Sequence, residues 1–220
     1  MRPERHGALD FYRIALPDGA ISDIKKSADE LKSYIAGVLA KTGASKVDLI
    51  CHSEGGLVSR YYIQNLGGAQ YVDDLVTIAT PHRGTTVASI GPGEAARQME
   101  VYSDFLRQLN SGDVLQGDVD YTAIFSNNDE MVFPVENGFF RGAVNANVNL
   151  LGHGGIMFNE DVYKIAKGAV STDIGGGRRA IPVVIQKTSM TTNSAGVSLK
   201  IAPFNHNYTS ADMGQMRISN

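Results

Sequence analysis

The feature that most constrains this chain is the stretch KVDLICHSEGGLVSRYYIQNLGG, residues 46–68. The run Val47–Cys51 is apolar enough to predict a strand that is buried on both faces. From Leu57 onward, apolar side chains recur at helical spacing until Gly67-Gly68 ends the pattern. Ser53 therefore lies at a sharp turn between a buried strand and a helix.

A serine in this position is typical of a nucleophile elbow, which requires small residues two positions before and after the serine. Cys51 and Gly55 occupy these positions. The usual first residue is glycine, so Cys51 is a departure, although cysteine is small enough to fit. The turn also places Ser53 at a helix N-terminus, where the backbone N–H of Glu54 can donate to a developing oxyanion. The alternative interpretation is a glycine-rich turn without catalytic function.

Composition bounds the kind of protein. A chain of 220 residues with 43% hydrophobic and 20% charged residues is typical of one globular domain, with room for an appendage. The net charge of −3 argues against a nucleic-acid partner, and the single cysteine excludes an internal disulfide. We expect no transmembrane segment, no metal site and no cofactor. No signal peptide is visible in the sequence, so the localisation stays unknown.

The rest of the chain predicts a mostly parallel α/β sheet with flanking helices, because buried strands and amphipathic helices alternate. We expect further strands at 8–16, 75–79, 121–126 and 143–150, and helices at 24–41, 94–110 and 161–170. These elements form a core over residues 1–172. Residues 173–220 read as a linker and a C-terminal extension, in which 181–186 and 197–201 are candidate short strands.

A serine hydroxyl needs a neighbouring base, and the base needs an orienting group. His153 follows the predicted strand 143–150 and precedes a helix, at the sheet edge where Ser53 lies, so we expect it to be the base. Asp129 follows the strand 121–126 and is the expected orienting acid. Glu130 is the alternative acid, whereas Asp120 lies at the wrong end of its strand. The order Ser53, Asp129, His153 differs from that of the two common serine-protease types.

The other four histidines are weaker candidates for the base. His52 is adjacent to Ser53, and neighbouring side chains at a turn project apart. His82 lies in the loop TPHRGTT after a strand and either contributes to a substrate pocket or has a structural role. His6 and His206 lie in the polar ends of the sequence.

Five stretches resemble the small bacterial lipases of the α/β-hydrolase superfamily, of the lipase class 2 type. They are TGASKVDLICHSEGGLVSRYYIQNLGG, VTIATPHRGT, ARQMEVYSDFLRQLN, YTAIFSNNDEMVFP and LLGHGGIMF, and the similarity runs in register from about residue 8 to 170. The resemblance implies an α/β-hydrolase fold and hydrolysis of carboxylic esters without a cofactor. It also implies that Ser53 is the nucleophile, His153 the base and Asp129 the orienting acid, with the Glu54 N–H as an oxyanion donor.

In such relatives, the segment that corresponds to residues 84–120 forms a small cap over the site. We therefore expect Met99 and Phe105, with His52 and His82, to contribute to a substrate pocket, although apolar residues here can equally pack the helix onto the sheet. The expected partner is a small ester or lipid substrate. Secretion is typical of the resembled family.

One expected part of the fold is missing from the sequence. In such enzymes a strand well upstream of the elbow ends in a His-Gly motif, and the loop that follows gives the second oxyanion N–H. His6-Gly7 has these letters but runs directly into the next strand. We therefore expect the chain to lack the first strands of the fold, to expose a sheet edge that favours self-association, and to hydrolyse esters less efficiently. The rival hypothesis is a catalytically impaired α/β-hydrolase remnant that acts as a binding protein.

Overall fold

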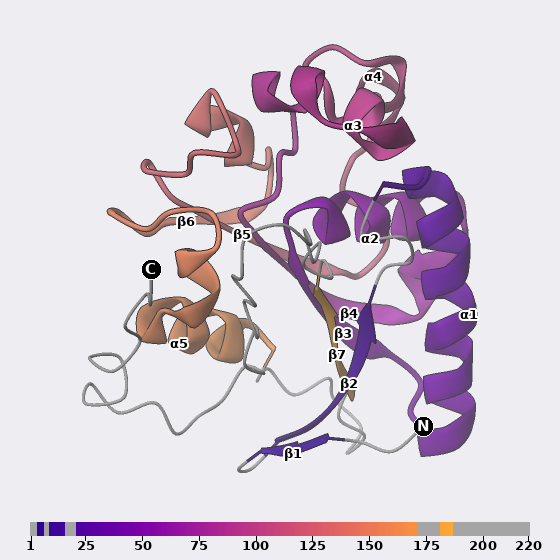
Figure 1. The fold of residues 1–220 in the computed structure, drawn as a ribbon. Helices are drawn as coiled ribbons and strands as arrows, with labels where there is room; N and C mark the ends of the chain where they lie inside the picture. The colour runs from indigo at the N-terminus through magenta and orange to yellow at the C-terminus, as the bar shows by residue number, and fades with distance from the viewer. Residues whose placement is uncertain (1–3, 7–8, 16–20, 171–180, 187–220) are drawn as a thin grey trace, which may run out of the picture.

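The protein forms a seven-stranded sheet flanked by helices on both faces (Figure 1). The structure is a computed structural model, and it describes residues 4–6, 9–15, 21–170 and 181–186. The strand order is β1-β2-β7-β3-β4-β5-β6. All neighbouring strands are parallel except β1 and β2, which form an antiparallel pair. The predicted fold class, a mostly parallel sheet with flanking helices, is confirmed.

The elements alternate along the chain as a parallel α/β sheet requires. The strands are β1 (Glu4–His6), β2 (Leu9–Ala15), β3 (Val47–His52), β4 (Val72–Ile78), β5 (Asp120–Phe125), β6 (Val144–Asn147) and β7 (Ile181–Gln186). The helices are α1 (Ile24–Thr42), α2 (Glu54–Asn65), α3 (Gly93–Met99), α4 (Asp104–Leu109) and α5 (Glu160–Ala169). Short 3-10 turns are η2 (Gly68–Gln70), η3 (Thr86–Ile90), η4 (Val135–Gly138) and η5 (Gly155–Phe158).

Helix α1 shows how local sequence sets the limits of an element. The side chain of Asp23 accepts a hydrogen bond from the Lys25 N–H and caps the first turn. At the other end Gly43 adopts φ 72°, a left-handed conformation that glycine adopts without strain, and its N–H bonds to the Leu39 carbonyl. Between these caps Ile24, Leu31 and Ile35 are fully or almost fully buried against the sheet. The predicted helix 24–41 is thus confirmed.

Two apolar clusters cover the two faces of the sheet. The larger contains Val47, Leu49 and Cys51 of β3 and packs them against α1 and α2. The smaller contains Val76 and Ile124, and packs them against α5 through Val162 and Ala166. Successive residues of a strand point to opposite faces, so the buried strands β3 and β4 contribute to both clusters. This double burial explains why apolar residues dominate both strands from their middle onward.

Strand β7 lies inside the sheet, between β2 and β3. It is parallel to both: Val183 is opposite Tyr12 on one side and Leu49 on the other. Its limits, 181–186, are those of a strand expected in the C-terminal extension. The second expected strand, 197–201, lies outside the described residues. The division into a core and an extension at residue 172 stays a prediction, but β7 is part of the same sheet.

Three expectations from the sequence need correction. The helix expected at 94–110 is two helices, α3 and α4, because Tyr102 takes a left-handed conformation and Ser103 caps a new helix. The strand expected at 143–150 is shorter, since β6 ends at Asn147 and Leu150 has φ 65°. Strand β1 was not expected, and it pairs with the outer edge of β2. None of the described helices has the length and apolar content that crossing a membrane requires.

Candidate active site

Ser53 stands at a strained turn between β3 and α2. Its backbone has φ 55° and ψ −126°, a conformation that a residue with a side chain adopts only when its surroundings enforce it. The Ser53 N–H donates to the Ile78 carbonyl at 2.8 Å, and the Ser53 carbonyl accepts from the Gly56 N–H at 3.1 Å. These bonds hold the hinge at the carboxyl end of β3, as a nucleophile elbow requires.

The elbow is also supported from the neighbouring strand. Thr80, which follows β4, donates its hydroxyl to the Ser53 carbonyl at 2.8 Å. This contact brings Thr80 so close to α2 that a Cβ on Gly56 would lie 2.2 Å from Thr80 Oγ1. Glycine is therefore required three positions after the serine. Cys51, the departure from the usual pattern, is fully buried, and its Sγ lies 3.0 Å from Ser59 Oγ.

The sequence-predicted base and nucleophile come together. His153 Nε2 lies 3.0 Å from Ser53 Oγ, although the two residues are 100 positions apart in the sequence. The serine is 8% exposed, and 14% of the histidine side chain is accessible, so the pair lies at the surface end of a buried strand. An imidazole nitrogen at this distance can accept the serine proton.

Asp129 contacts the opposite side of the same imidazole. Both of its carboxylate oxygens lie 3.0 Å from His153 Nδ1. Asp129 Oδ1 also accepts the backbone N–H groups of Met131 and Val132, each at 2.9 Å. These bonds fix the carboxylate from its own loop, so the ring of His153 is held with Nε2 toward Ser53.

The electrostatics of Asp129 suit this arrangement. Burial acts to raise the pKa of the Asp129 carboxyl, but the hydrogen bond and charge of His153 and the two backbone N–H donors outweigh burial. The pKa of Asp129 therefore lies below its usual value, and the carboxylate is ionised at neutral pH. An ionised, nearly buried carboxylate can stabilise the imidazolium that forms when His153 takes a proton.

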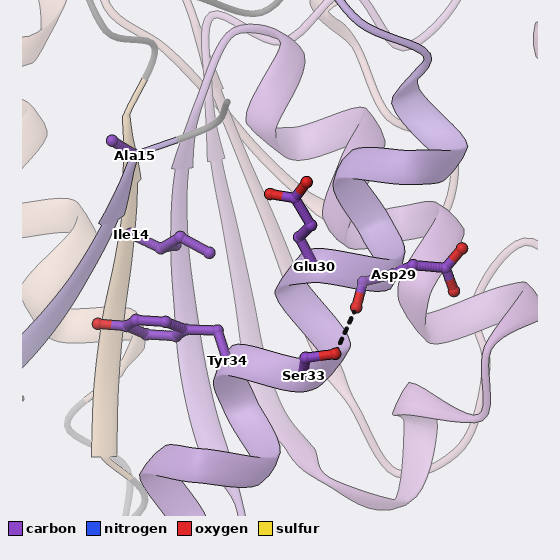
Figure 2. Close-up of a pocket in the computed structure, with 6 residues that line it drawn as sticks. All are labelled: Ile14, Ala15, Asp29, Glu30, Ser33 and Tyr34. Carbon is purple, nitrogen blue, oxygen red and sulfur yellow. Dashed lines mark hydrogen bonds between the residues drawn. The ribbon is translucent and has the colours of Figure 1, made fainter. Parts of the chain in front are cut away.

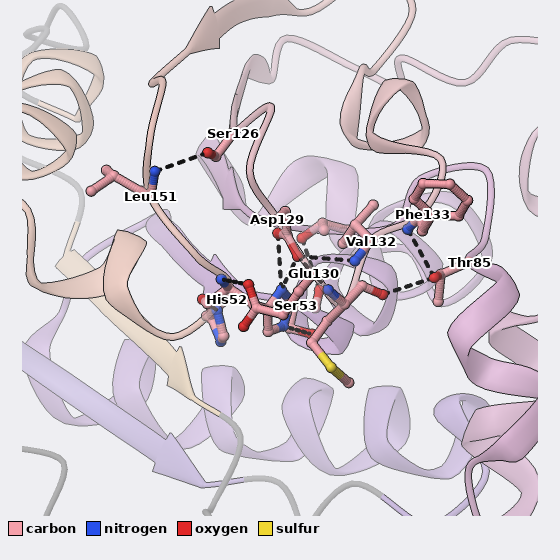
Figure 3. A network of polar contacts seen from close by, with 12 residues as sticks. His52, Ser53, Thr85, Ser126, Asp129, Glu130, Val132, Phe133 and Leu151 are labelled. Atoms are coloured by element: carbon pink, nitrogen blue, oxygen red, sulfur yellow. Dashed lines mark hydrogen bonds and ion pairs between the residues drawn. The ribbon is translucent and has the colours of Figure 1, made fainter.

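Hydroxyl and carboxylate side chains hold two loops in place: the loop that carries Asp129, and the loop that carries His153, called the histidine loop here (Figure 3). Thr85 donates to the Met131 carbonyl at 2.7 Å and accepts from the Phe133 N–H at 3.0 Å. Ser126 accepts from the Leu151 N–H at 3.3 Å. Glu130, the alternative acid, accepts the backbone N–H of His153 at 2.9 Å and so contacts the histidine loop rather than the imidazole. Sequence reasoning missed Thr85 and Ser126, because hydroxyl residues in loops carry no distinctive pattern.

His52 lies beside the triad residues. Its Nε2 is 2.9 Å from the carbonyl oxygen of His153, and the two rings are 4.7 Å apart. The structure thus brings this predicted pocket residue to the site, where its hydrogen bond positions the histidine loop.

His82, another predicted pocket residue, lies in the protein interior instead. It is 1% exposed, its ring stacks on Phe140, and its Nε2 lies 3.0 Å from Thr77 Oγ1. Its Nδ1 is 3.4 Å from a guanidinium nitrogen of Arg60, which is itself fully buried. Arg60 in turn donates to the Leu109 carbonyl at 3.0 Å. This network ties the loop after β4 to the end of α4.

The pKa of His82 predicts acid sensitivity of the fold. Burial, followed by the charges of Arg60 and Arg83, lowers this pKa well below its usual value. The unfolded chain binds a proton at His82 below about pH 6.5 and the folded protein does not, so stability falls as the pH drops. Between pH 7 and 5 we expect a loss on the order of 1–2 kcal/mol from this residue. Urea unfolding of wild type and His82→Gln at both pH values measures it, and equal losses in the two proteins would contradict the prediction.

Met99 and Phe105, the remaining predicted pocket residues, pack within the larger apolar cluster. Phe105 is buried and stacks on Tyr61 of α2, with ring centroids 5.9 Å apart. Met99 is partly buried against the same cluster, and its carbonyl accepts the Thr85 N–H. The segment 84–120 is therefore anchored to the sheet by its apolar side chains.

An open groove of about 540 Å³ lies elsewhere, between β2 and α1 (Figure 2). It is lined by Ile14, Ala15, Asp29, Glu30, Ser33 and Tyr34. None of the triad residues contributes to this groove. The groove is a surface depression that carries two exposed carboxylates, Asp29 and Glu30. The site around Ser53 is therefore the stronger candidate for a functional site.

Comparison with curated proteins finds bacterial lipases. The chain is 50% identical over 87 residues to a protein named triacylglycerol lipase from Pseudarthrobacter phenanthrenivorans, and equally to one of that name from Burkholderia plantarii. The matched region is 39% of this chain, and it spans only about a quarter of each relative, 26% and 23% of their lengths.

Solved structures and family comparison agree on the fold. Aspergillus fumigatus lipase B superposes with a TM-score of 0.63 at 21% identity, over 72% of this chain and 44% of that one. The propeptide form of Bacillus licheniformis lipase BlEst2 gives 0.59 at 13% identity, over 81% and 55%. The predicted α/β-hydrolase fold is thus confirmed. The sequence profile of the palmitoyl protein thioesterase family matches residues 7–117, half of the chain. The chain therefore belongs to the palmitoyl protein thioesterase family.

Proposed function

We propose that this protein is a serine hydrolase that cleaves carboxylic esters through an acyl-enzyme. The observation that carries the proposal is the unbroken line of contacts from Ser53 Oγ through His153 to the Asp129 carboxylate, with 3.0 Å at each step. The three residues come from the ends of different strands, and the serine lies at a strained elbow. A serine, an imidazole and a carboxylate in contact in this order form the arrangement of a Ser-His-Asp triad, which supports catalysis.

In the acylation step Ser53 Oγ attacks the carbonyl carbon of the ester while His153 Nε2 takes the hydroxyl proton. The carbonyl oxygen becomes an oxyanion, toward which the Glu54 N–H in the first turn of α2 donates. The tetrahedral intermediate then collapses, and the bond to the leaving oxygen breaks. His153 gives its proton to that oxygen, and the alcohol departs.

In the deacylation step water replaces the alcohol. His153 Nε2 removes a proton from the water, the hydroxide attacks the acyl carbon, and the bond to Ser53 Oγ breaks. The proton returns from His153 to the serine oxygen, and the free acid is released. Asp129 keeps its charge throughout and stabilises the imidazolium in both steps.

The substrate class follows from chemistry and from the relatives together. Two relatives are named triacylglycerol lipase, and the family is described as a palmitoyl protein thioesterase. Both descriptions concern acyl groups bound to oxygen or sulfur. We propose that the acyl donor here is a carboxylic ester or thioester, and that the lipid ester is the natural class.

Reaction with a fluorophosphonate probe tests the proposal without a matched substrate. The probe phosphonylates only a serine that a base activates. We expect rapid labelling, with the modified peptide mapped to Ser53 by mass spectrometry. A well-folded protein that is not labelled would contradict the proposal. It would favour the rival hypothesis of a binding protein with an impaired site.

The role of Asp129 is tested by Asp129→Asn. We expect kcat for ester hydrolysis to fall about 10⁴-fold, because the neutral amide stabilises the wrong tautomer of His153 and cannot stabilise its charged form. The matched control is Glu130→Gln, which removes the neighbouring charge but keeps an acceptor for the His153 N–H. The control is expected to lose less than about tenfold. The reverse ranking would assign the orienting role to Glu130.

A further inference from the structure

Three buried carboxylates meet at the opposite end of the sheet from Ser53. Asp48 is the second residue of β3, and Asp73 and Asp74 are the second and third residues of the adjacent strand β4. One side-chain oxygen from each lies within 4.8 Å of the other two. Because strands β3 and β4 are parallel, their first residues share one edge, and the elbow lies at the other edge.

The cluster is buried rather than solvated. Asp48 is 2%, Asp74 4% and Asp73 8% exposed. Oδ1 of Asp48 is buried and has no hydrogen-bond partner among the described residues. An unpaired carboxylate oxygen in such a place is costly, since burial removes its hydration without replacing it. The Asp48 carboxylate therefore requires a binding partner that the surrounding side chains of the described residues do not provide.

Positive charge in the cluster falls short of the negative charge. Lys46 lies 3.2 Å from Asp73 and is the only cation that forms an ion pair with the three carboxylates in the described part of the chain. One cation therefore faces three buried carboxylates in this part of the described structure.

We propose that Asp48, Asp73 and Asp74 form a binding site for a hard divalent cation, with calcium as the preferred ion. Carboxylate oxygens are the ligands that calcium takes, at 2.3–2.6 Å. Two oxygens on opposite sides of such an ion are about 5 Å apart, so the separation of up to 4.8 Å leaves room for calcium between them. Magnesium requires shorter distances and near-ideal octahedral geometry, which three carboxylates on two strands fit less well.

A cation here would act on the fold rather than on the chemistry. It would join the first residues of β3 and β4. In this region the register between the two strands shifts, between Val47 and Leu49. The site is distinct from the triad and does not depend on the proposed hydrolase activity. The sequence alone did not point to it, because Asp48 and Asp73 are separated by a helix and meet only through strand pairing.

The test uses the full chain after treatment with EDTA. Isothermal titration with CaCl₂ is expected to show saturable binding at one site, and calcium at about 100 times Kd is expected to raise Tm by about 5–10 °C. Asp48→Asn keeps the shape of the side chain but removes one ligand charge. We expect this variant to bind calcium at least tenfold more weakly. In EDTA it is expected to melt at a higher temperature than wild type, since the repulsion is relieved.

Asp29→Asn is the matched control, because it removes one exposed carboxylate of α1 and leaves the cluster intact. It is expected to bind calcium as wild type does. No saturable binding to wild type up to about 10 mM calcium, ten times the weakest calcium modules, would overturn the proposal. Equal increases in Tm for wild type and Asp48→Asn would overturn it as well. Stronger binding of magnesium than of calcium would refute the preference for calcium. If Asp48→Asn does not fold, Asp74→Asn replaces it, and the titration of wild type still decides.

Discussion

Ser53→Ala is expected to lower kcat for ester hydrolysis by about 10⁶-fold, because removal of the nucleophile of a triad costs about as much as removal of the whole triad. The alanine keeps the elbow, whose strained backbone is held by bonds from Ile78, Gly56 and Thr80 to main-chain atoms of residue 53. The variant is therefore expected to fold like the wild type. Hydrolysis of p-nitrophenyl esters from short to long acyl chains, measured for both proteins, gives the ratio and the chain-length preference.

Ser59→Ala is the control for this loss. Ser59 lies on the same helix and is buried, but its hydroxyl donates to the Gly55 carbonyl and contacts Cys51, away from His153. It is expected to cost stability of about 1 kcal/mol and to leave kcat within a few-fold of wild type. Residual ester hydrolysis in Ser53→Ala equal to that of wild type would show that another group carries the reaction.

A chain that ends at residue 172 is expected to lose its cooperative unfolding transition. Without β7, neither β2 nor β3 has a partner on its facing side, and two rows of backbone N–H and C=O groups lose their hydrogen bonds in the middle of the sheet. The expected product is aggregated or molten protein. Thermal melting by circular dichroism and size-exclusion chromatography measure both outcomes.

A chain that ends at residue 190 is the matched control, because it keeps β7 and lacks most of the same extension. We expect it to melt near the temperature of the full chain. If the chain of 172 residues melts as cooperatively as the chain of 190, the sheet does not need β7 for its stability. Strands β2 and β3 would then find other hydrogen-bond partners.

Much of this architecture could be predicted from the sequence because its signals are local. The apolar runs of β3 and β4 are buried on both faces, and the capped amphipathic pattern of α1 sets its limits. Ser53, Asp129 and His153 were predicted because each follows a strand, and parallel strands end at one edge of a sheet. The structure brings these three side chains together.

What could not be predicted depends on contacts between distant segments. The sequence showed a strand at 181–186 but not that it lies between β2 and β3. Met99 and Phe105 were expected at a pocket because the corresponding segment of relatives forms a cap, and His82 because it lies in a loop after a strand. In the structure His82 and Phe105 are buried, and Met99 packs partly buried against the larger apolar cluster. The break between α3 and α4 at Tyr102 also has no local sign, since tyrosine seldom adopts the left-handed conformation.

The position of β7 has a consequence for the order of folding. Val47 of the nucleophile strand is opposite Ile181, about 130 residues later in the sequence, so this pairing closes a very long loop and is expected to form slowly. During synthesis β2, β3, β4 and β5 leave the ribosome well before β7 does. Until then two facing strand edges stay open, and the growing chain is exposed to pairing with other chains. The nascent protein is therefore expected to depend on chaperones until β7 is made.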